Sequence, residues 1–78
     1  MHELTLANEI LKFVLKEAKD SKITSIKIAL ADDGHTTSES LSEAFGLISQ
    51  GTLAEGAELK IEEAGELDTR VVDLEVEK

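Results

Sequence analysis

The sequence has 78 residues, of which 41% are hydrophobic and 32% charged, so it predicts one small domain with a modest core. Seventeen acidic residues against eight basic ones give a net charge of −9, which repels phosphate backbones and argues against sequence-independent nucleic-acid binding. There is no cysteine, which excludes a disulfide framework, a thiolate zinc site, an iron–sulfur cluster and a cysteine nucleophile.

The first predicted element is an amphipathic helix from about Thr5 to about Asp20. Apolar side chains recur there at helical spacing, while the lysines lie largely off that stripe. The stripe consists of Leu6, Ile10, Phe13, Val14 and Ala18. Thr5 is the expected cap, because a hydroxyl can accept a hydrogen bond from a first-turn amide. Met1–Glu3 would then run extended along the sheet.

A strand is predicted next, from about Ile23 to about Ala31. Ile26, Ile28 and Leu30 alternate with small or polar residues, so one face of this strand is apolar. The stretch "DDGHTT" follows, and its aspartates and glycine are typical of a turn.

Residues 37–51 predict a second helix, with Thr37 or Ser38 as its cap and Gly51 as a left-handed residue at its end. Its apolar stripe consists of Leu41, Ala44, Phe45 and Ile48. Gly46 interrupts this stripe and weakens the helix locally. A close packing partner is one reason for a glycine at such a position.

Two strands are predicted at the end of the sequence, over residues 57–64 and 70–78. Both alternate apolar and polar side chains, which indicates one buried face. The apolar positions are Leu59, Ile61, Val72, Leu74 and Val76. Because the connection between the two strands is short, we expect them to pair as an antiparallel hairpin.

These elements together predict an α/β (α+β) fold, a two-layer sandwich of two helices on a small, mixed three-stranded sheet. Residues 1–78 form a single domain in this prediction. If the strand–helix–strand unit is parallel, its crossover should be right-handed. A small sheet also leaves an exposed edge, which permits self-association into a homodimer or exchange of an element between copies.

The amino terminus is the candidate metal site, because His2 lies one peptide bond from the α-amine of Met1. The amine, the His2 backbone nitrogen and a His2 imidazole nitrogen can form fused chelate rings around one ion. Nickel(II) accepts such square-planar nitrogen sets, and Glu3 or a ligand from a partner can fill the fourth position. Copper(II) should bind at least as tightly, so these ligands alone do not select nickel. The alternative interpretation is an ordinary frayed terminal histidine.

His35 is the second candidate ligand, and it can complete the site if its turn folds near the amino terminus. The alternative is an exposed turn histidine. Asp32 and Asp33 fit a turn better than a calcium site, because further oxygen ligands at loop spacing are missing. No serine has a histidine base at a recognisable spacing, so the protein is not expected to be an enzyme.

Several stretches resemble the HypA family of nickel-insertion factors for hydrogenase maturation. They are "MHE" at residues 1–3, Ser40–Leu41 through Ala44–Phe45, "GTLAEGAEL" at residues 51–59 and "VDLEVE" at residues 72–77. The resemblance implies a nickel-binding metallochaperone domain with Met1, His2 and Glu3 as the metal site. It also implies two partners, a HypB-like GTPase and the hydrogenase large subunit, which would be met through the N-terminal helix.

The sequence departs from this family in one large feature. The family carries a zinc domain with paired Cys-x-x-Cys motifs, inserted between the last two strands. Here that place, between about residues 63 and 70, holds only "AGELD". The alternative to a nickel metallochaperone is therefore a metal-independent interaction or structural domain, which lost chaperone activity with its zinc module. No apolar run has the length of a membrane span and the start lacks a secretion signal, so a cytoplasmic protein is expected.

Overall fold

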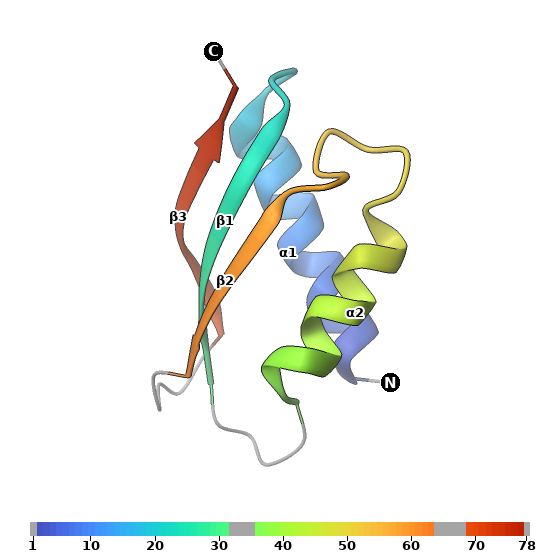
Figure 1. Cartoon of the computed structure of the whole chain (residues 1–78), viewed down its shortest axis with the longest axis vertical. Helices are drawn as coiled ribbons and strands as arrows, with labels where there is room; N and C mark the ends of the chain where they lie inside the picture. Colours follow the sequence, from blue (N-terminus) through green and yellow to red (C-terminus); the bar gives the residue numbers. More distant parts are fainter. Residues whose placement is uncertain (1, 32–35, 64–68, 78) are drawn as a thin grey trace.

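A computed structural model describes residues 2–31, 36–63 and 69–77, with side chains from Leu4 onward. Helices and strands follow one another in the predicted order, helix, strand, helix, strand, strand (Figure 1). They are α1 (His2–Ala18), β1 (Ile23–Leu30), α2 (Ser38–Ile48), β2 (Glu58–Glu63) and β3 (Arg70–Val76).

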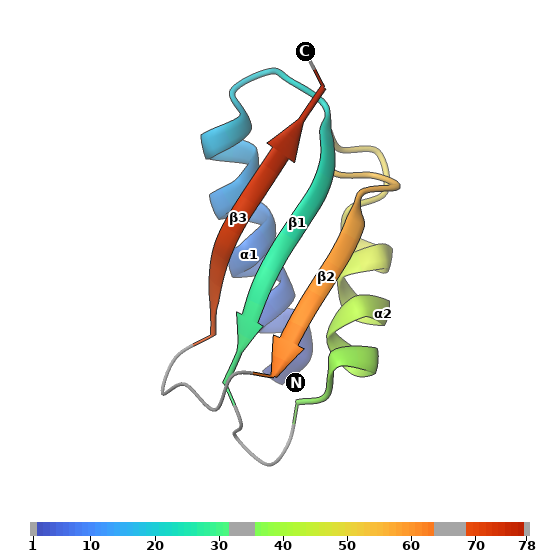
Figure 2. The ribbon, with the colours of Figure 1, turned by 60° about the vertical axis from the view of Figure 1, so that its left-hand side comes forward.

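The strands form one mixed sheet in the order β2-β1-β3, so β1 lies at its centre (Figure 2). β2 is parallel to β1 and pairs Leu59 with Ile26, while β3 is antiparallel and pairs Leu74 with Ile26. The mixed three-stranded sheet is confirmed, but the predicted hairpin between the last two strands is wrong. The most apolar strand takes the central position, because only there are both of its edges covered. Its fully or almost fully buried aliphatic residues are Ile23, Ile26, Ile28 and Leu30.

The connection from β2 to β3 has to bridge the width of β1. β2 ends and β3 begins at the same end of the sheet, and two strand spacings separate those ends by roughly 10 Å. Residues 64–69 can span roughly 20 Å when extended, so a short connection is enough. The backbone amide of Ala31 donates to the Thr69 hydroxyl at 2.9 Å, which ties the end of β1 to the start of β3.

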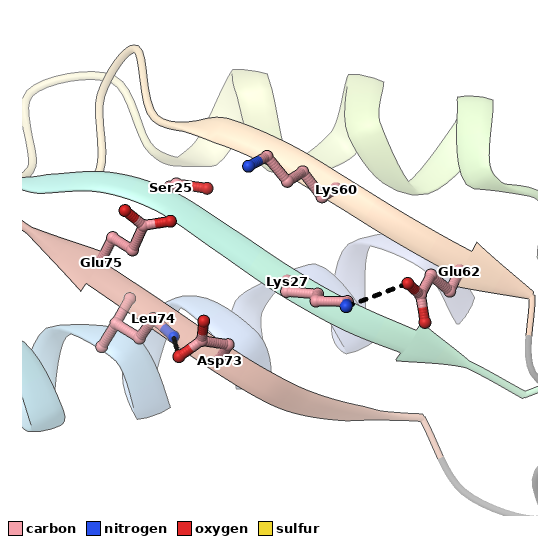
Figure 3. A pocket seen from close by; sticks show the side chains of 7 residues that line it. All are labelled: Ser25, Lys27, Lys60, Glu62, Asp73, Leu74 and Glu75. Carbon is pink, nitrogen blue, oxygen red and sulfur yellow. Dashed lines mark hydrogen bonds and ion pairs between the residues drawn. The ribbon is translucent and has the colours of Figure 1, made fainter.

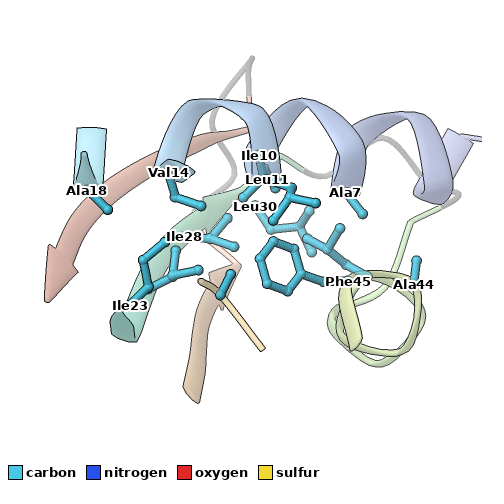
Figure 4. Close-up of a cluster of buried hydrophobic side chains, with 13 residues drawn as sticks. Ala7, Ile10, Leu11, Val14, Ala18, Ile23, Ile28, Leu30, Ala44 and Phe45 are labelled. Atoms are coloured by element: carbon cyan, nitrogen blue, oxygen red, sulfur yellow. The ribbon is translucent and has the colours of Figure 1, made fainter. Parts of the chain in front are cut away.

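Both helices lie on one face of the sheet and leave the other face uncovered, which confirms the two-layer arrangement (Figures 1 and 2). α1 packs against α2, and both helices pack against the sheet. The space between the layers is filled by aliphatic side chains and one aromatic ring, as the composition predicts (Figure 4). These residues include Ala7, Leu11, Val14, Ile23, Ile28, Leu41, Ala44 and Phe45. Neither of the helices that the structure describes has the length and apolar character needed to cross a membrane.

α1 begins at His2, so the predicted start at Thr5 is too late. The predicted extended run over residues 1–3 is also wrong for the two of them that the structure describes, because their backbone is helical. The reason is burial that extends beyond the predicted stripe. Ala7 is fully buried, and Leu4 is partly buried against the same core. Helical geometry in the first turn keeps both side chains on the buried face.

α2 begins with a capping box. The Thr37 hydroxyl accepts a hydrogen bond from the Ser40 backbone amide at 3.0 Å, and the Ser40 hydroxyl accepts one from the Thr37 amide at 3.1 Å. Thr37 is therefore confirmed as the cap. Gly51 is confirmed as a left-handed residue after the helix, with φ +80. Gly46 lacks the predicted close packing partner, because a Cβ built there meets no described heavy atom within 4 Å apart from its chain neighbours and the backbone of its own helix.

β3 contains a bulge at Val72. Its pairing with β1 shifts between Val71 and Asp73, so Val72 has no residue opposite it. The Val72 side chain is 53% exposed, whereas Val71, Leu74 and Val76 pack against the core. The prediction that Val72 faces the core is wrong, because strict alternation of faces fails across a bulge.

Candidate functional site

The candidate metal site begins in the first turn of α1. His2 and Glu3 are the first two helical residues. In an α-helix, the first-turn backbone N–H groups have no carbonyl acceptor within the helix. The backbone nitrogens of His2 and Glu3 are therefore not needed for the hydrogen bonds of α1. Met1 and the side chains of His2 and Glu3 lie outside the described part of the chain, so their role as ligands stays a prediction.

Several elements meet at the end of the molecule where α1 starts. The carboxyl ends of β1 and β2 lie at this end, and α2 and β3 begin there (Figures 1 and 2). The segments 32–35 and 64–68 join these elements and lie outside the described residues. His35 belongs to the first of these segments, and its role as a second ligand also remains a prediction.

An apolar groove of about 260 Å³ lies between α1 and the start of β3. Its lining residues are Leu6, Glu9, Ile10, Phe13, Thr69, Arg70 and Val71. Phe13 is 48% exposed, although its spacing predicted a place in the buried stripe of α1. Phe13 instead lines this groove beside the start of β3, which is an edge strand of the sheet. Sequence reasoning missed this groove, because it forms between residues far apart in the chain.

The uncovered face of the sheet carries a shallow hollow of about 270 Å³, lined mainly by polar and charged side chains (Figure 3). The Lys27 ammonium lies 3.1 Å from a carboxylate oxygen of Glu62. The Asp73 carboxylate accepts a hydrogen bond at 2.9 Å from the backbone amide of Leu74. Throughout the described residues, no group of three or more His, Cys, Asp or Glu side chains could hold a metal ion. The amino terminus stays the predicted site of metal chemistry.

Comparison with known proteins first defines the class of this chain. Residues 1–67 match the family described as "Hydrogenase/urease nickel incorporation, metallochaperone, hypA". This description is that of a class of nickel metallochaperones. The chain belongs to the HypA family, as the resemblance in its sequence predicts.

Curated relatives from bacteria and archaea carry the name hydrogenase maturation factor HypA. The protein of Chlorobaculum tepidum is 41% identical over 66 residues, which cover 81% of this chain and 58% of the relative. The protein of Archaeoglobus fulgidus is 34% identical over 64 residues, covering 78% of this chain and 58% of the relative. The protein of Methanocaldococcus jannaschii is 34% identical over 70 residues, covering 80% of this chain and 56% of the relative.

The chain thus spans little more than half the length of these relatives. The family match ends at residue 67, between β2 and β3. This is the connection in which the family resemblance expects a zinc domain. β3 lies beyond the matched stretch but completes the sheet by pairing with β1. The three-stranded sheet of this chain therefore forms with only residues 64–69 between β2 and β3.

Proposed function

We propose that this chain is a nickel-binding metallochaperone domain for hydrogenase maturation, and that it binds Ni(II) through Met1, His2 and Glu3. Membership of the HypA family is the observation that carries the proposal. The helical start of α1 at His2 supports it, because the amides that would bind the metal are not used by the helix.

The ligand set follows from the covalent chain. The α-amine of Met1, the deprotonated backbone nitrogen of His2 and its imidazole close two fused rings around a square-planar ion. Glu3 offers a further backbone nitrogen or its carboxylate for the fourth position, and a ligand from a partner can take the same place. A deprotonated amide carries negative charge, which the positive end of the α1 dipole favours. Loss of the amide proton also leaves the hydrogen bonds within α1 intact.

A ligand set at a chain end suits transfer of the ion rather than its storage. An acceptor can reach the ion without unfolding the donor, since no surrounding shell of protein needs to open. We infer that the recipients are a HypB-like GTPase and the hydrogenase large subunit. The protein would act by binding and handing over nickel and would not itself be an enzyme. Selection of nickel over copper would then depend on the partner, because copper(II) binds such ligands at least as tightly.

Calorimetric titration of Ni(II) into protein with Met1 as its free amino terminus tests this proposal. We expect one bound ion per chain and an absorbance band typical of square-planar nickel. His2→Ala should abolish tight binding, and so should a Gly-Ser extension before Met1, because the amine is then no longer terminal. His35→Ala is the matched control. Unchanged affinity in this variant removes His35 from the site, and a large loss includes it.

The outcome that contradicts the proposal is equally specific. If His2→Ala binds nickel as tightly as the parent, the amino-terminal ligand set is wrong. If the parent gives neither heat nor colour with Ni(II), the metal-independent interaction domain becomes the better interpretation.

A further inference from the structure

The first turns of α1 are packed into the core of the domain. Ala7 is 0% exposed, Leu11 is 7% exposed, and Leu4 is partly buried against the same cluster. Spacings of three and four residues put these three side chains on one face of the helix. Ala7 lies on the side of α1 that faces α2 (Figure 4). The start of α1 is therefore held by contacts with distant parts of the chain, and not only by the helix propensity of its own residues.

The helical backbone at His2 sets the spacing of two amide nitrogens. His2 is the first residue of α1. With standard bond lengths, a helical residue places its own nitrogen and the next one about 2.8 Å apart, whereas an extended residue separates them by about 3.5 Å. Neighbouring corners of a square-planar site are also about 2.8 Å apart when the metal–nitrogen bonds are about 2.0 Å long. The first turn of α1 thus presents the nitrogens of His2 and Glu3 at the spacing of adjacent ligands.

We propose that Leu4 and Ala7 are positioning residues for the nickel site, and that they couple nickel affinity to the folding of α1. The inference rests on the proposed function, because it takes the metal to bind at residues 1–3. Neither side chain binds the ion itself. Their packing holds the first turn helical, and this turn keeps the nitrogens of His2 and Glu3 close enough to bind one ion. The backbone nitrogen of Glu3, and not its carboxylate, then takes the fourth position.

The size of this effect depends on the order that the unfolded chain lacks. The unfolded chain carries the same consecutive ligands and also binds nickel, but its backbone samples extended as well as helical conformations. Fixing the backbone of one residue lowers an equilibrium constant about tenfold. The folded protein should therefore bind nickel about tenfold more tightly than the unfolded chain. Because a ligand that prefers the folded state stabilises it, saturating nickel should raise the folding equilibrium constant by the same factor.

Urea unfolding with and without saturating Ni(II) tests the coupling, in protein with Met1 as its free amino terminus. We expect nickel to raise the folding equilibrium constant of the parent about tenfold and to leave that of His2→Ala unchanged. Calorimetric titration of the folded protein separates this inference from the proposed nickel site. Tight binding that His2→Ala abolishes, together with an unfolding equilibrium that nickel does not change, would overturn the coupling and leave the nickel site standing. A parent that binds no nickel would overturn both.

Leu4→Ala tests a positioning residue directly. Alanine keeps the helix propensity high but removes the packing of the first turn. Nickel affinity measured by calorimetry should fall between about threefold and about tenfold, since tenfold is the whole effect of the ordered backbone. Leu15→Ala is the matched control, because Leu15 is also partly buried against the core but lies about 16 Å further along α1. It should leave nickel affinity unchanged. Ala7→Gly should weaken binding as Leu4→Ala does, and Ala18→Gly near the far end of α1 is its control.

Further variants separate positioning from a general loss of structure. Leu4→Met keeps the packing volume and should retain the parental affinity. The absorbance band of bound nickel at saturation should be the same in Leu4→Ala as in the parent, because the ligands are unchanged. Glu3→Gln keeps the backbone nitrogen and should bind with nearly the parental affinity.

The positioning role is overturned if Leu4→Ala and Leu15→Ala bind nickel equally tightly, or if Leu4→Met loses as much affinity as Leu4→Ala. A large loss of affinity in Glu3→Gln would assign the fourth position to the carboxylate and overturn the proposed geometry. Circular dichroism should show every variant folded before nickel is added.

Discussion

The two helices of this protein begin in opposite ways. α2 begins with a capping box, in which Thr37 and Ser40 satisfy each other's backbone amides. α1 begins at His2, among the residues that we propose as metal ligands. Both starts leave first-turn amides without helical acceptors, as every α-helix does. In α2 the Thr37 hydroxyl accepts a hydrogen bond from the Ser40 amide, whereas in α1 the proposed nickel site would use the amides of His2 and Glu3.

If the nickel site lies at the amino terminus as proposed, stability and metal chemistry depend on different helix ends. α2 needs its cap because it is short, spanning Ser38–Ile48, and because it carries Phe45 into the core. α1 spans His2–Ala18 and is held by a long buried stripe, so its first turn can be given to a ligand. The contrast predicts that variants at α2 change the free energy of unfolding, whereas changes at the start of α1 alter nickel affinity.

The largest expected effect on stability comes from Phe45→Ala. The ring is 2% exposed at the centre of the core, and its removal should lower the free energy of unfolding by about 3–5 kcal/mol. Urea unfolding followed by circular dichroism measures this loss. Leu47→Ala on the same helix is the control and should change stability by less than about 0.5 kcal/mol, because Leu47 is 67% exposed. If folded Phe45→Ala protein no longer binds nickel, the separation between the two helices is wrong.

Acidification should weaken nickel binding at the start of α1. The α-amine titrates at about 8 and imidazole at about 6.5, and the proposed site also requires an amide to lose its proton. All three ligands bind the metal in their deprotonated form, so affinity falls as the pH falls. We expect a loss of about a hundredfold between roughly pH 7.5 and 6.5. Nickel titrations at both values measure it, and an affinity that is constant over this range would exclude amine and amide ligands.

Removing the cap of α2 should have a smaller effect, and it should change the free energy of unfolding but not the nickel affinity. Thr37→Ala removes the acceptor of the Ser40 amide and should lower the free energy of unfolding by about 1 kcal/mol. Nickel affinity should stay unchanged, because the cap consists only of hydroxyl and backbone groups of α2 and includes none of the proposed ligands. The exposed Glu39→Gln in the same turn is a control for charge near the helix start. A Thr37→Ala protein with full stability but reduced nickel affinity would reverse the proposed assignment.

The helices and strands could be predicted from the sequence because their signals are local. Apolar spacing identified every element, and hydroxyl chemistry identified Thr37 as a cap. Strand pairing could not be predicted in the same way. β2 and β3 are neighbours in sequence, but both pair with β1, because the most apolar strand takes the centre of the sheet. The bulge at Val72 is equally non-local, since it exists only in the pairing of β3 with β1.

The candidate site also has parts that are local in the sequence and parts that depend on the fold. Its proposed ligands are consecutive residues, so chelate chemistry and the family resemblance predicted Met1, His2 and Glu3 without any knowledge of the fold. The helical start at His2 was missed, because it depends on packing of the first turn against distant parts of the chain. A groove beside Gly46, between α2 and the start of β2, was missed for a similar reason. Periodicity shows that a glycine interrupts a stripe, but only the fold shows that an unpaired strand lies next to it.

Two glycines of the α2 region provide the last and smallest test, because only one of them has a backbone conformation that favours glycine. Gly51 has φ +80, so Gly51→Ala should lower the free energy of unfolding by about 1 kcal/mol. Gly46 lies within α2 with open space at its Cβ position, so Gly46→Ala should raise that free energy by about 0.5–1 kcal/mol. Urea unfolding at low protein concentration measures the monomer in both cases. A destabilising Gly46→Ala would mean that the folded chain itself needs this glycine.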